Sequence, residues 1–180
     1  MKNISKSRLI GIVILSLLVL GLSCANTATQ DLREQFVDGF IETHNSMAEA
    51  EVALSSAMSL AEGGAYTSAV SKISEAELDS QHALLSLPWG VVSDMQKQNT
   101  GVSENEVLTL LATRVSKFRD GIDHFLEAMR YIQQSDISGH NQEIAQANSN
   151  FSASWDAEYS LQDKVKTDAN LNYLRQALGW

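Results

Sequence analysis

One stretch of sequence decides the fold: residues 103–132, which read SENEVLTLLATRVSKFRDGIDHFLEAMRYI. Apolar side chains recur in it in steps of three and four residues, a spacing that places them on one face of an α-helix. Eight residues fill eight successive positions of this pattern: Leu108, Leu111, Val115, Phe118, Ile122, Phe125, Met129 and Ile132. The stretch therefore predicts a long amphipathic helix that buries one face against other helices.

A capping motif marks the expected beginning of this helix. Ser103 is followed three residues later by Glu106, as in a capping box, where the serine oxygen accepts from the glutamate backbone N–H and the glutamate side chain reaches back. Val102 and Val107 stand at the positions of a hydrophobic staple. We therefore expect the helix to begin directly after Ser103.

Two earlier segments, residues 27–62 and 65–87, show the same helical period. The stripe of the first contains Phe36, Phe40, Thr43, Met47, Ala50, Leu54, Ala57 and Ala61. The stripe of the second contains Tyr66, Ala69, Val70, Ile73, Ala76, Ala83, Leu84 and Leu87. The glycine pair 63–64 should end the first helix, and Pro88 with Gly90 should end the second.

A fourth helical segment is expected to begin near Ser138 or His140. Its apolar positions are Ile144, Ala147, Phe151, Trp155, Leu161 and Val165, and a last group follows at Leu171, Leu174 and Leu178. The pattern weakens near Lys166. Because aspartate is a good helix cap, we expect a kink or break near Thr167-Asp168.

These four stripes predict an all-α fold. The connections at 62–65 and 135–139 are short and the one at 88–102 is long, while no strand-like alternation of useful length appears. Short connections favour antiparallel neighbours. The sequence therefore predicts that residues 31–180 form an antiparallel up-down four-helix bundle.

Composition and charge exclude several classes of protein. The chain has 180 residues, with a single Cys, a single Pro and a formal net charge of −9. A single cysteine excludes a disulfide-stapled scaffold. The acidic balance argues against nucleic acid as a partner, because nucleic-acid binding calls for a basic patch.

The N-terminus has the organisation of a secretory signal peptide. Lys2, Lys6 and Arg8 are basic, and the uncharged run LIGIVILSLLVLGL follows at residues 9–22. A membrane-spanning helix needs about 20 apolar residues, and this run has 14. Its length and flanks favour a cleaved signal peptide over a membrane span.

The end of this apolar run resembles the lipobox of bacterial lipoproteins. It reads Leu20-Gly21-Leu22-Ser23-Cys24, with a small residue before the only cysteine, although Gly21 stands where that family prefers leucine. The resemblance implies that residues 1–23 are removed and that the Cys24 thiol receives a diacylglyceryl group. It also implies a lipid-anchored protein on the extracytoplasmic side of the cell membrane or outer membrane. The alternatives are a plain secretory signal and an uncleaved anchor.

A lipid on Cys24 would place the helices close to the bilayer. Residues 24–30 then form a short tether of roughly 20 Å at most. In an up-down bundle, Trp89 and Trp180 share the membrane-facing end, where tryptophan is enriched. The alternative is that Trp89 only caps the end of the bundle and that Trp180 lies at a frayed terminus. The opposite end carries the glycine pair 63–64 with Ser138 and His140, and we expect a protein partner to bind there.

No pattern of catalytic or metal-ligating residues emerges. The four histidines are His44, His82, His124 and His140. Di-iron bundles need two Glu-x-x-His pairs, and the nearest matches are Asp79-Ser80-Gln81-His82 and the reversed His140-x-x-Glu143. Neither Cys-x-x-Cys-His nor Gly-x-Ser-x-Gly occurs. We therefore expect no catalytic residue, metal or cofactor, and place His44 and His124 at the edges of the helix interfaces.

The leading hypothesis is a non-enzymatic interaction, scaffold or accessory subunit at the cell envelope. A small-ligand-binding bundle of the sensory type is the alternative, in which Phe151, Trp155 and Tyr159 line an apolar cleft rather than fill the core. A scaffold predicts a filled core with an exposed patch, and a binding module predicts a cavity of a few hundred Å³ with convergent polar groups. A metal-dependent enzyme would require buried carboxylates around His82.

Overall fold

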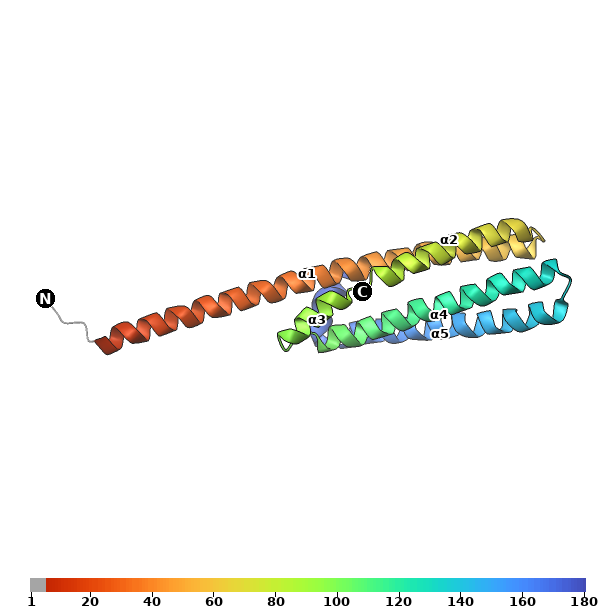
Figure 1. Ribbon diagram of the computed structural model, residues 1–180. Coiled ribbons are helices and arrows are strands. Elements are labelled where there is room, and N and C mark those ends of the chain that lie inside the picture. Colours follow the sequence, from red (N-terminus) through yellow and green to blue (C-terminus); the bar gives the residue numbers. More distant parts are fainter. Residues whose placement is uncertain (1–5) are drawn as a thin grey trace.

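The computed structural model describes the backbone of residues 6–180 and the side chains of residues 29–180. Within that range the chain is all-helical and contains no strand (Figure 1), which confirms the predicted class. The elements in order are α1 (Lys6–Glu62), α2 (Tyr66–Leu85), α3 (Trp89–Lys97), α4 (Val102–Gln133), α5 (Ile137–Thr167), the 3₁₀ turn η1 (Ala169–Leu171) and α6 (Asn172–Leu178).

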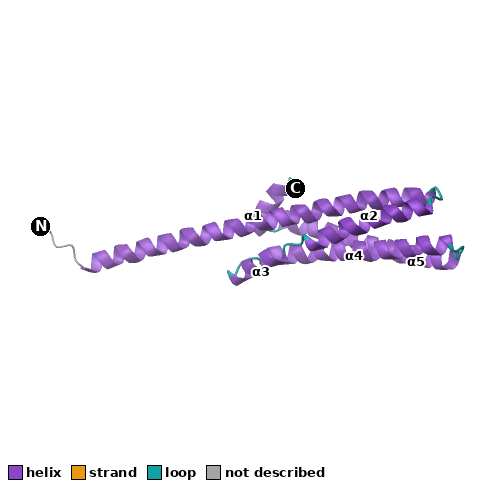
Figure 2. Cartoon of the chain, turned by 45° about the horizontal axis from the view of Figure 1, so that its top comes forward, coloured by secondary structure: helices purple, strands orange, loops and turns teal. Residues whose placement is uncertain are grey.

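The long helices form two antiparallel hairpins that lie side by side (Figures 1 and 2). α1 pairs with α2, α4 pairs with α5, and the hairpins meet mainly through α2 and α4. α1 and α5, which a regular bundle would place next to each other, share little close backbone contact within the described chain. We call the end with the α1–α2 and α4–α5 turns the distal end. The opposite end, with α3, η1 and α6, is the proximal end, from which the first turns of α1 project.

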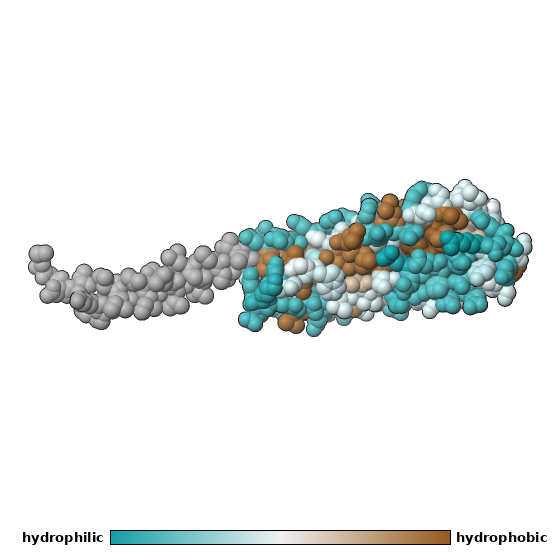
Figure 3. All heavy atoms as spheres, viewed as in Figure 1, coloured by the Kyte–Doolittle hydropathy of each residue, from teal (hydrophilic) through white to brown (hydrophobic). Residues whose placement is uncertain are grey.

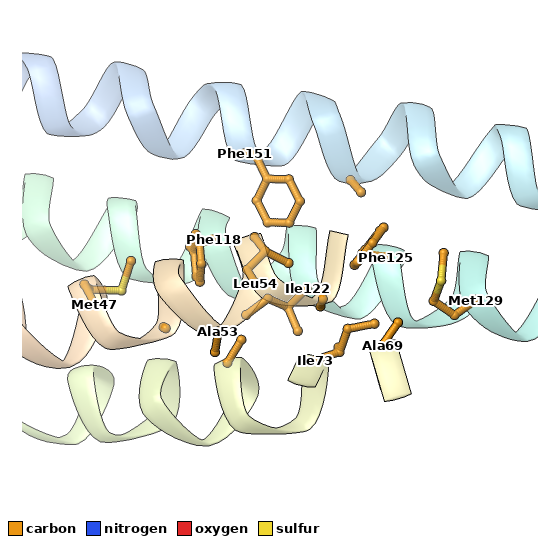
Figure 4. Packing of buried hydrophobic residues seen from close by; sticks show 14 of the residues in the cluster. Met47, Ala53, Leu54, Ala69, Ile73, Phe118, Ile122, Phe125, Met129 and Phe151 are labelled. Carbon is orange, nitrogen blue, oxygen red and sulfur yellow. The ribbon is translucent and has the colours of Figure 1, made fainter. Parts of the chain in front are cut away.

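The predicted apolar stripes form the core. Every stripe position of α1 from Phe36 to Ala57 is buried, and so are the first seven of the eight positions in α4. The core has a distal cluster around Met47, Ile73 and Ile122 and a proximal cluster of Phe36, Phe40 and the α6 leucines. Figure 4 shows Phe151 reaching from α5 toward Leu54 and Ile122. At about 25 cal/mol per Å², burial of these side chains is the main stabilising contribution to the fold.

Two stripe residues were assigned to the wrong face. Leu84 in α2 is 37% exposed and Trp155 in α5 is 48% exposed. The buried seam of α5 instead continues from Phe151 through Ser154 and Glu158. These two polar residues keep the three-and-four spacing and contact the buried Arg114. Because a pattern of apolar residues alone passes over them, it assigned the neighbouring Trp155 to the buried face.

The predicted capping box does not form. α4 begins at Val102, one residue before the expected cap, and its N-cap is Gly101 in the left-handed region (φ 83°). Val102 is 69% exposed and therefore makes no hydrophobic staple. Gly101 is required by close approach as well as by φ, because a Cβ there would lie 2.6 Å from the Cβ of Met95. The glycine, rather than the serine, sets the start of this helix.

The long connection at 88–102 contains a helix, α3, that the sequence pattern did not predict. Pro88 is the N-cap residue of α3, directly before its first helical residue, Trp89. Val92 and Met95 of α3 are buried in the proximal cluster. Two buried side chains on one short helix cover the end of the core that a loop would leave exposed to water.

Other helix ends agree with the sequence. α1 ends at Glu62, directly before the glycine pair, and Gly64 adopts a left-handed conformation (φ 77°). α5 ends at Thr167, and the Asp168 carboxylate accepts from the backbone N–H of Asn170 (2.9 Å). The Ser103 hydroxyl, that N–H and the Lys164 ammonium together lower the pKa of Asp168 to about 2. The break predicted at Thr167-Asp168 is therefore confirmed.

Candidate functional site

An open groove at the distal end is the best candidate site. It has a volume of about 310 Å³ and lies between the two hairpins. Its lining is mostly apolar and comes from α1, α2, α4 and α5: Met58, Ala61, Glu62, Tyr66, Phe125, Met129, Ile132, His140, Ile144 and Asn148. We call this surface the distal groove. A volume of this size accommodates one or two large apolar side chains or a small ligand.

The turn between α4 and α5 positions the polar side of the distal groove. The Asp136 carboxylate accepts from the backbone N–H of Gly139 (2.9 Å) and caps α5. Gly139 passes so close to Tyr131 that a Cβ there would lie 2.7 Å from the tyrosine ring. The next residue, His140, holds its Nδ1 3.0 Å from the carbonyl oxygen of Ala128. Because a carbonyl only accepts, Nδ1 donates, and in the neutral ring Nε2 remains an acceptor.

A histidine–carboxylate contact ties α4 to α5 near this groove. His124 Nδ1 lies 2.6 Å from Glu143 Oε2, and both side chains are partly buried. The expectation that His124 lies at the edge of a helix interface agrees with this position. The pair fixes the register of α4 against α5 below the groove.

The residues predicted at the distal end do come together there. The 63–64 glycine pair forms the α1–α2 turn, and Ser138 and His140 lie in the first turn of α5. Of these, only His140 lines the distal groove, while Ser138 is exposed. Phe125 and Met129 in the apolar walls were assigned to the core, whereas Met58 belongs to no predicted stripe, and only the packing of the hairpins shows that all three line an opening.

A buried polar cluster, which the sequence did not reveal, crosses the interior between α1, α4 and α5. Arg114 Nη2 lies 2.7 Å from Glu51 Oε1, and Arg114 Nη1 lies 3.0 Å from Glu158 Oε2. The second contact is an ion pair without hydrogen-bond alignment, and Arg114 Nε has no acceptor. Ser154 donates to the Arg114 backbone oxygen (2.9 Å). The sequence offered one indication that Arg114 is buried. Arg114 lies three residues after Leu111 and four before Phe118, which is the spacing of the apolar stripe.

His44 belongs to the same cluster. Its ring stacks on Phe40, its Nδ1 lies 3.3 Å from Arg114 Nη1, and the Trp180 ring meets it edge-on (5.9 Å between centroids). Burial lowers the pKa of His44, and the Arg114 guanidinium lowers it further, against the opposing charges of Glu158 and Glu51. The surroundings of His44 therefore favour its neutral form.

We predict that His44 makes the fold less stable in mild acid. Its pKa is lower in the folded chain than the unfolded value of 6.5, so below pH 6.5 the unfolded chain binds more protons. Stability is therefore full above that pH and decreases as the pH falls toward the folded-state pKa. Urea unfolding at pH 7.5 and 5.5 should show a smaller decrease for His44→Gln than for the wild type. His82→Gln, at an exposed position, is the control and should behave as the wild type; equal decreases in all three proteins would contradict the prediction.

The remaining predicted residues are spread over the molecule. His82 is exposed, and in residues 29–180 no three His, Cys, Asp or Glu side chains gather closely enough to hold a metal ion. Phe151 is buried, but Trp155 and Tyr159 are exposed, so these aromatic residues do not line a common cleft. Figure 3 shows apolar residues along the middle of one face. Leu78 and Leu85 of α2 are exposed.

The two tryptophans expected at the membrane-facing end are both at the proximal end. Trp89 begins α3 and is partly exposed, whereas Trp180 packs against His44, with the Lys166 ammonium 6.0 Å from its ring centroid. Cys24, the predicted lipidation site, is part of helix α1. Its side chain lies outside the range of residues whose side chains the structure describes. The helices of residues 29–180 contain no apolar stretch long enough to span a membrane.

Comparison with known proteins does not extend this description. The chain matches no protein-family model, no curated protein and no solved structure.

Proposed function

We propose that this protein is a lipid-anchored, extracytoplasmic four-helix bundle that works as a non-enzymatic accessory subunit at the cell envelope. Cys24 carries the anchor, and the distal groove binds an apolar segment of a partner protein. The observation that carries the proposal is the open, mostly apolar groove at the end of the molecule opposite to Cys24.

The length of α1 supports this division of roles. From Cys24 to Met58 the chain is helical throughout, and 34 residues at 1.5 Å each span about 50 Å. A lipid on Cys24 would therefore hold the distal groove about 50 Å from the bilayer surface if α1 stands upright. That distance reaches past the headgroups to the extracytoplasmic part of a neighbouring membrane protein.

The occupant we propose is an amphipathic helix with apolar anchors and flanking basic residues. Apolar side chains from such a helix fit between Met58, Met129 and Ile144, in the mode by which helices bind grooves. The protein carries a net charge of −9, and Glu62 lies in the groove wall. Basic flanks on the partner would therefore be attracted and acidic ones repelled.

Ala61→Arg should abolish this interaction. The substitution places a long cation in the groove, where it occupies the apolar space and repels a basic partner, while arginine in the last turn of α1 suits the helix dipole. With a photo-crosslinking amino acid in place of Ile132 in the native host, we expect Ala61→Arg to reduce crosslinking at least tenfold. The crosslinked partner peptide should be apolar with basic flanks.

The matched control is Leu78→Arg, an apolar-to-arginine change at an exposed position of α2 outside the groove. It should leave the crosslink intact. Loss of the crosslink in Leu78→Arg but not in Ala61→Arg would contradict the groove and point to the exposed face of α2.

A small ligand in the same groove is the second candidate function. Glu62, His140 and Asn148 place a few polar groups among the apolar walls, as ligand pockets do. In that case Ala61→Arg would abolish binding of an apolar fluorescent probe to the isolated protein, and no partner peptide would crosslink at Ile132.

A further inference from the structure

A second pocket lies at the proximal end, between α1, the α3–α4 connection and η1. Its volume is about 230 Å³. The polar residues of its wall are Thr29, Arg33, Thr100, Ser103, Glu104 and Asn170. We call it the proximal pocket. It is separate from the distal groove and shares no residue with it.

Glu104 is a buried carboxylate in this wall. Only 4% of the residue is exposed, and Tyr173 donates its hydroxyl to Oε1 at 2.9 Å. Among the described residues Glu104 has no ion pair. Buried charges in proteins are normally paired with an opposite charge, because removing a carboxylate from water is costly. Burial and the Glu104 charge together raise the pKa of the Tyr173 hydroxyl, so the phenol stays a donor.

Arg33 is the complementary charge in the same pocket. Its guanidinium carbon lies 5.0 Å from the centroid of the Tyr173 ring, and within the described chain it too has no ion pair. Tyr173 therefore stands between Arg33 and Glu104, with its ring toward the guanidinium and its hydroxyl on the carboxylate. The two opposite charges face one pocket without pairing with each other.

We propose that the proximal pocket binds a small zwitterion that carries a primary ammonium and an anionic group. The ammonium pairs with Glu104, and the anionic group pairs with Arg33. A primary ammonium has three N–H donors, and Thr100 and Asn170 offer further oxygen acceptors in the wall. A bare anion would be repelled by Glu104 and by Glu34 and Asp38, which line the adjoining groove. A bare cation would leave Arg33 unpaired.

Two sources offer this chemistry: the headgroup of phosphatidylethanolamine and a free α-amino acid. Arg33 lies nine residues after Cys24 on the continuous helix α1, which is a rise of about 14 Å. The polar region of one leaflet is about 5–8 Å thick. If Cys24 is lipidated, as the proposed function requires, the pocket lies on the membrane side of the molecule, where a tilt of α1 brings it down to the headgroups, and the lipid headgroup is the favoured source. The pocket itself does not depend on the anchor.

The test is a titration of the mature protein in detergent with phosphoethanolamine, glycine and phosphocholine, followed by NMR. We expect saturable binding of phosphoethanolamine. Phosphocholine, which has no N–H donor, should bind at least tenfold more weakly. Glu104→Gln and Arg33→Gln should each weaken phosphoethanolamine binding at least tenfold. Glu106→Gln, an exposed position two residues along α4, is the matched control and should bind as the wild type.

The outcomes separate the sources and the two proposals. Binding of glycine without phosphoethanolamine would assign the pocket to free amino acids. No saturable binding of either zwitterion, or binding that persists in both variants, would overturn the proposal. Arg33 is exposed, so Arg33→Gln should keep the thermal unfolding of the wild type even if Glu104→Gln does not fold. The intact mass of the mature protein, measured separately, shows whether Cys24 carries lipid and therefore tests the anchor alone.

Discussion

Replacing Arg114 with alanine should destabilise the folded protein by about 3–5 kcal/mol, the largest effect we expect from a single change in the core. The substitution leaves Glu158, whose side chain is 4% exposed, as a buried carboxylate without a cation, and it removes the partner of Glu51. A further cost comes from the space that the arginine stem fills beside Phe118. Urea unfolding followed by circular dichroism at pH 7.5 measures the effect.

Two controls identify the buried charge as the cause. Arg130→Ala removes an exposed arginine of the same helix that pairs with Glu127, and it should cost less than about 1 kcal/mol. The double variant Arg114→Met with Glu158→Leu replaces the buried pair by apolar side chains and should recover most of the loss. Equal destabilisation by Arg114→Ala and Arg130→Ala would show that the cluster does not stabilise the fold.

Cys24→Ala should move the protein completely from the detergent phase to the aqueous phase, or leave it with its signal peptide attached. The lipobox-like sequence predicts a diacylglyceryl group on the Cys24 thiol, and two or three acyl chains hold a protein stably on a membrane. The measurement is intact mass and detergent partitioning of the protein from its native host. The wild type should begin at Cys24 and carry the added lipid mass.

Ser23→Ala is the matched control for this prediction, because it keeps a small residue before the cysteine and should leave processing intact. An unmodified soluble chain cut near Cys24 would contradict the anchor and favour a secreted ligand-binding module. An uncleaved membrane anchor would give a different result. In that case the wild type keeps residues 1–23, and both the wild type and Cys24→Ala stay in the detergent phase.

The residues that sequence reasoning placed correctly share one property: their position follows from apolar periodicity. The stripes of α1 and α4 are buried as predicted because a 3.6-residue helix leaves no other face for Phe36, Phe40, Leu108 or Val115. The error at Trp155 occurs where polar residues occupy the buried face. Trp155 was placed inside because Ser154 and Glu158 do not read as core positions, although Arg114 across the interface makes them so.

The candidate sites show the same limit. His140 was placed at the distal end from chain order alone, and it does line the groove there. The proximal pocket was invisible, because Arg33, Glu104 and Tyr173 are far apart in the chain. Their contacts arise only when α6 folds back beside α1 and α4. The sequence pattern assigned Ser103 to a helix cap, whereas the structure places it in the wall of the proximal pocket.

The sequence by itself determined the all-helical class, the buried stripes of α1 and α4 and the ends of α1 and α5. These features depend on neighbours within a few residues, since helical period, glycine turns and aspartate caps are local properties. Only the tertiary structure decided that Arg114 is buried, that the two hairpins leave a groove between them and that Glu104 and Arg33 face one pocket. Each of these depends on charges and surfaces from distant segments, whose pairing energies appear only when the helices pack.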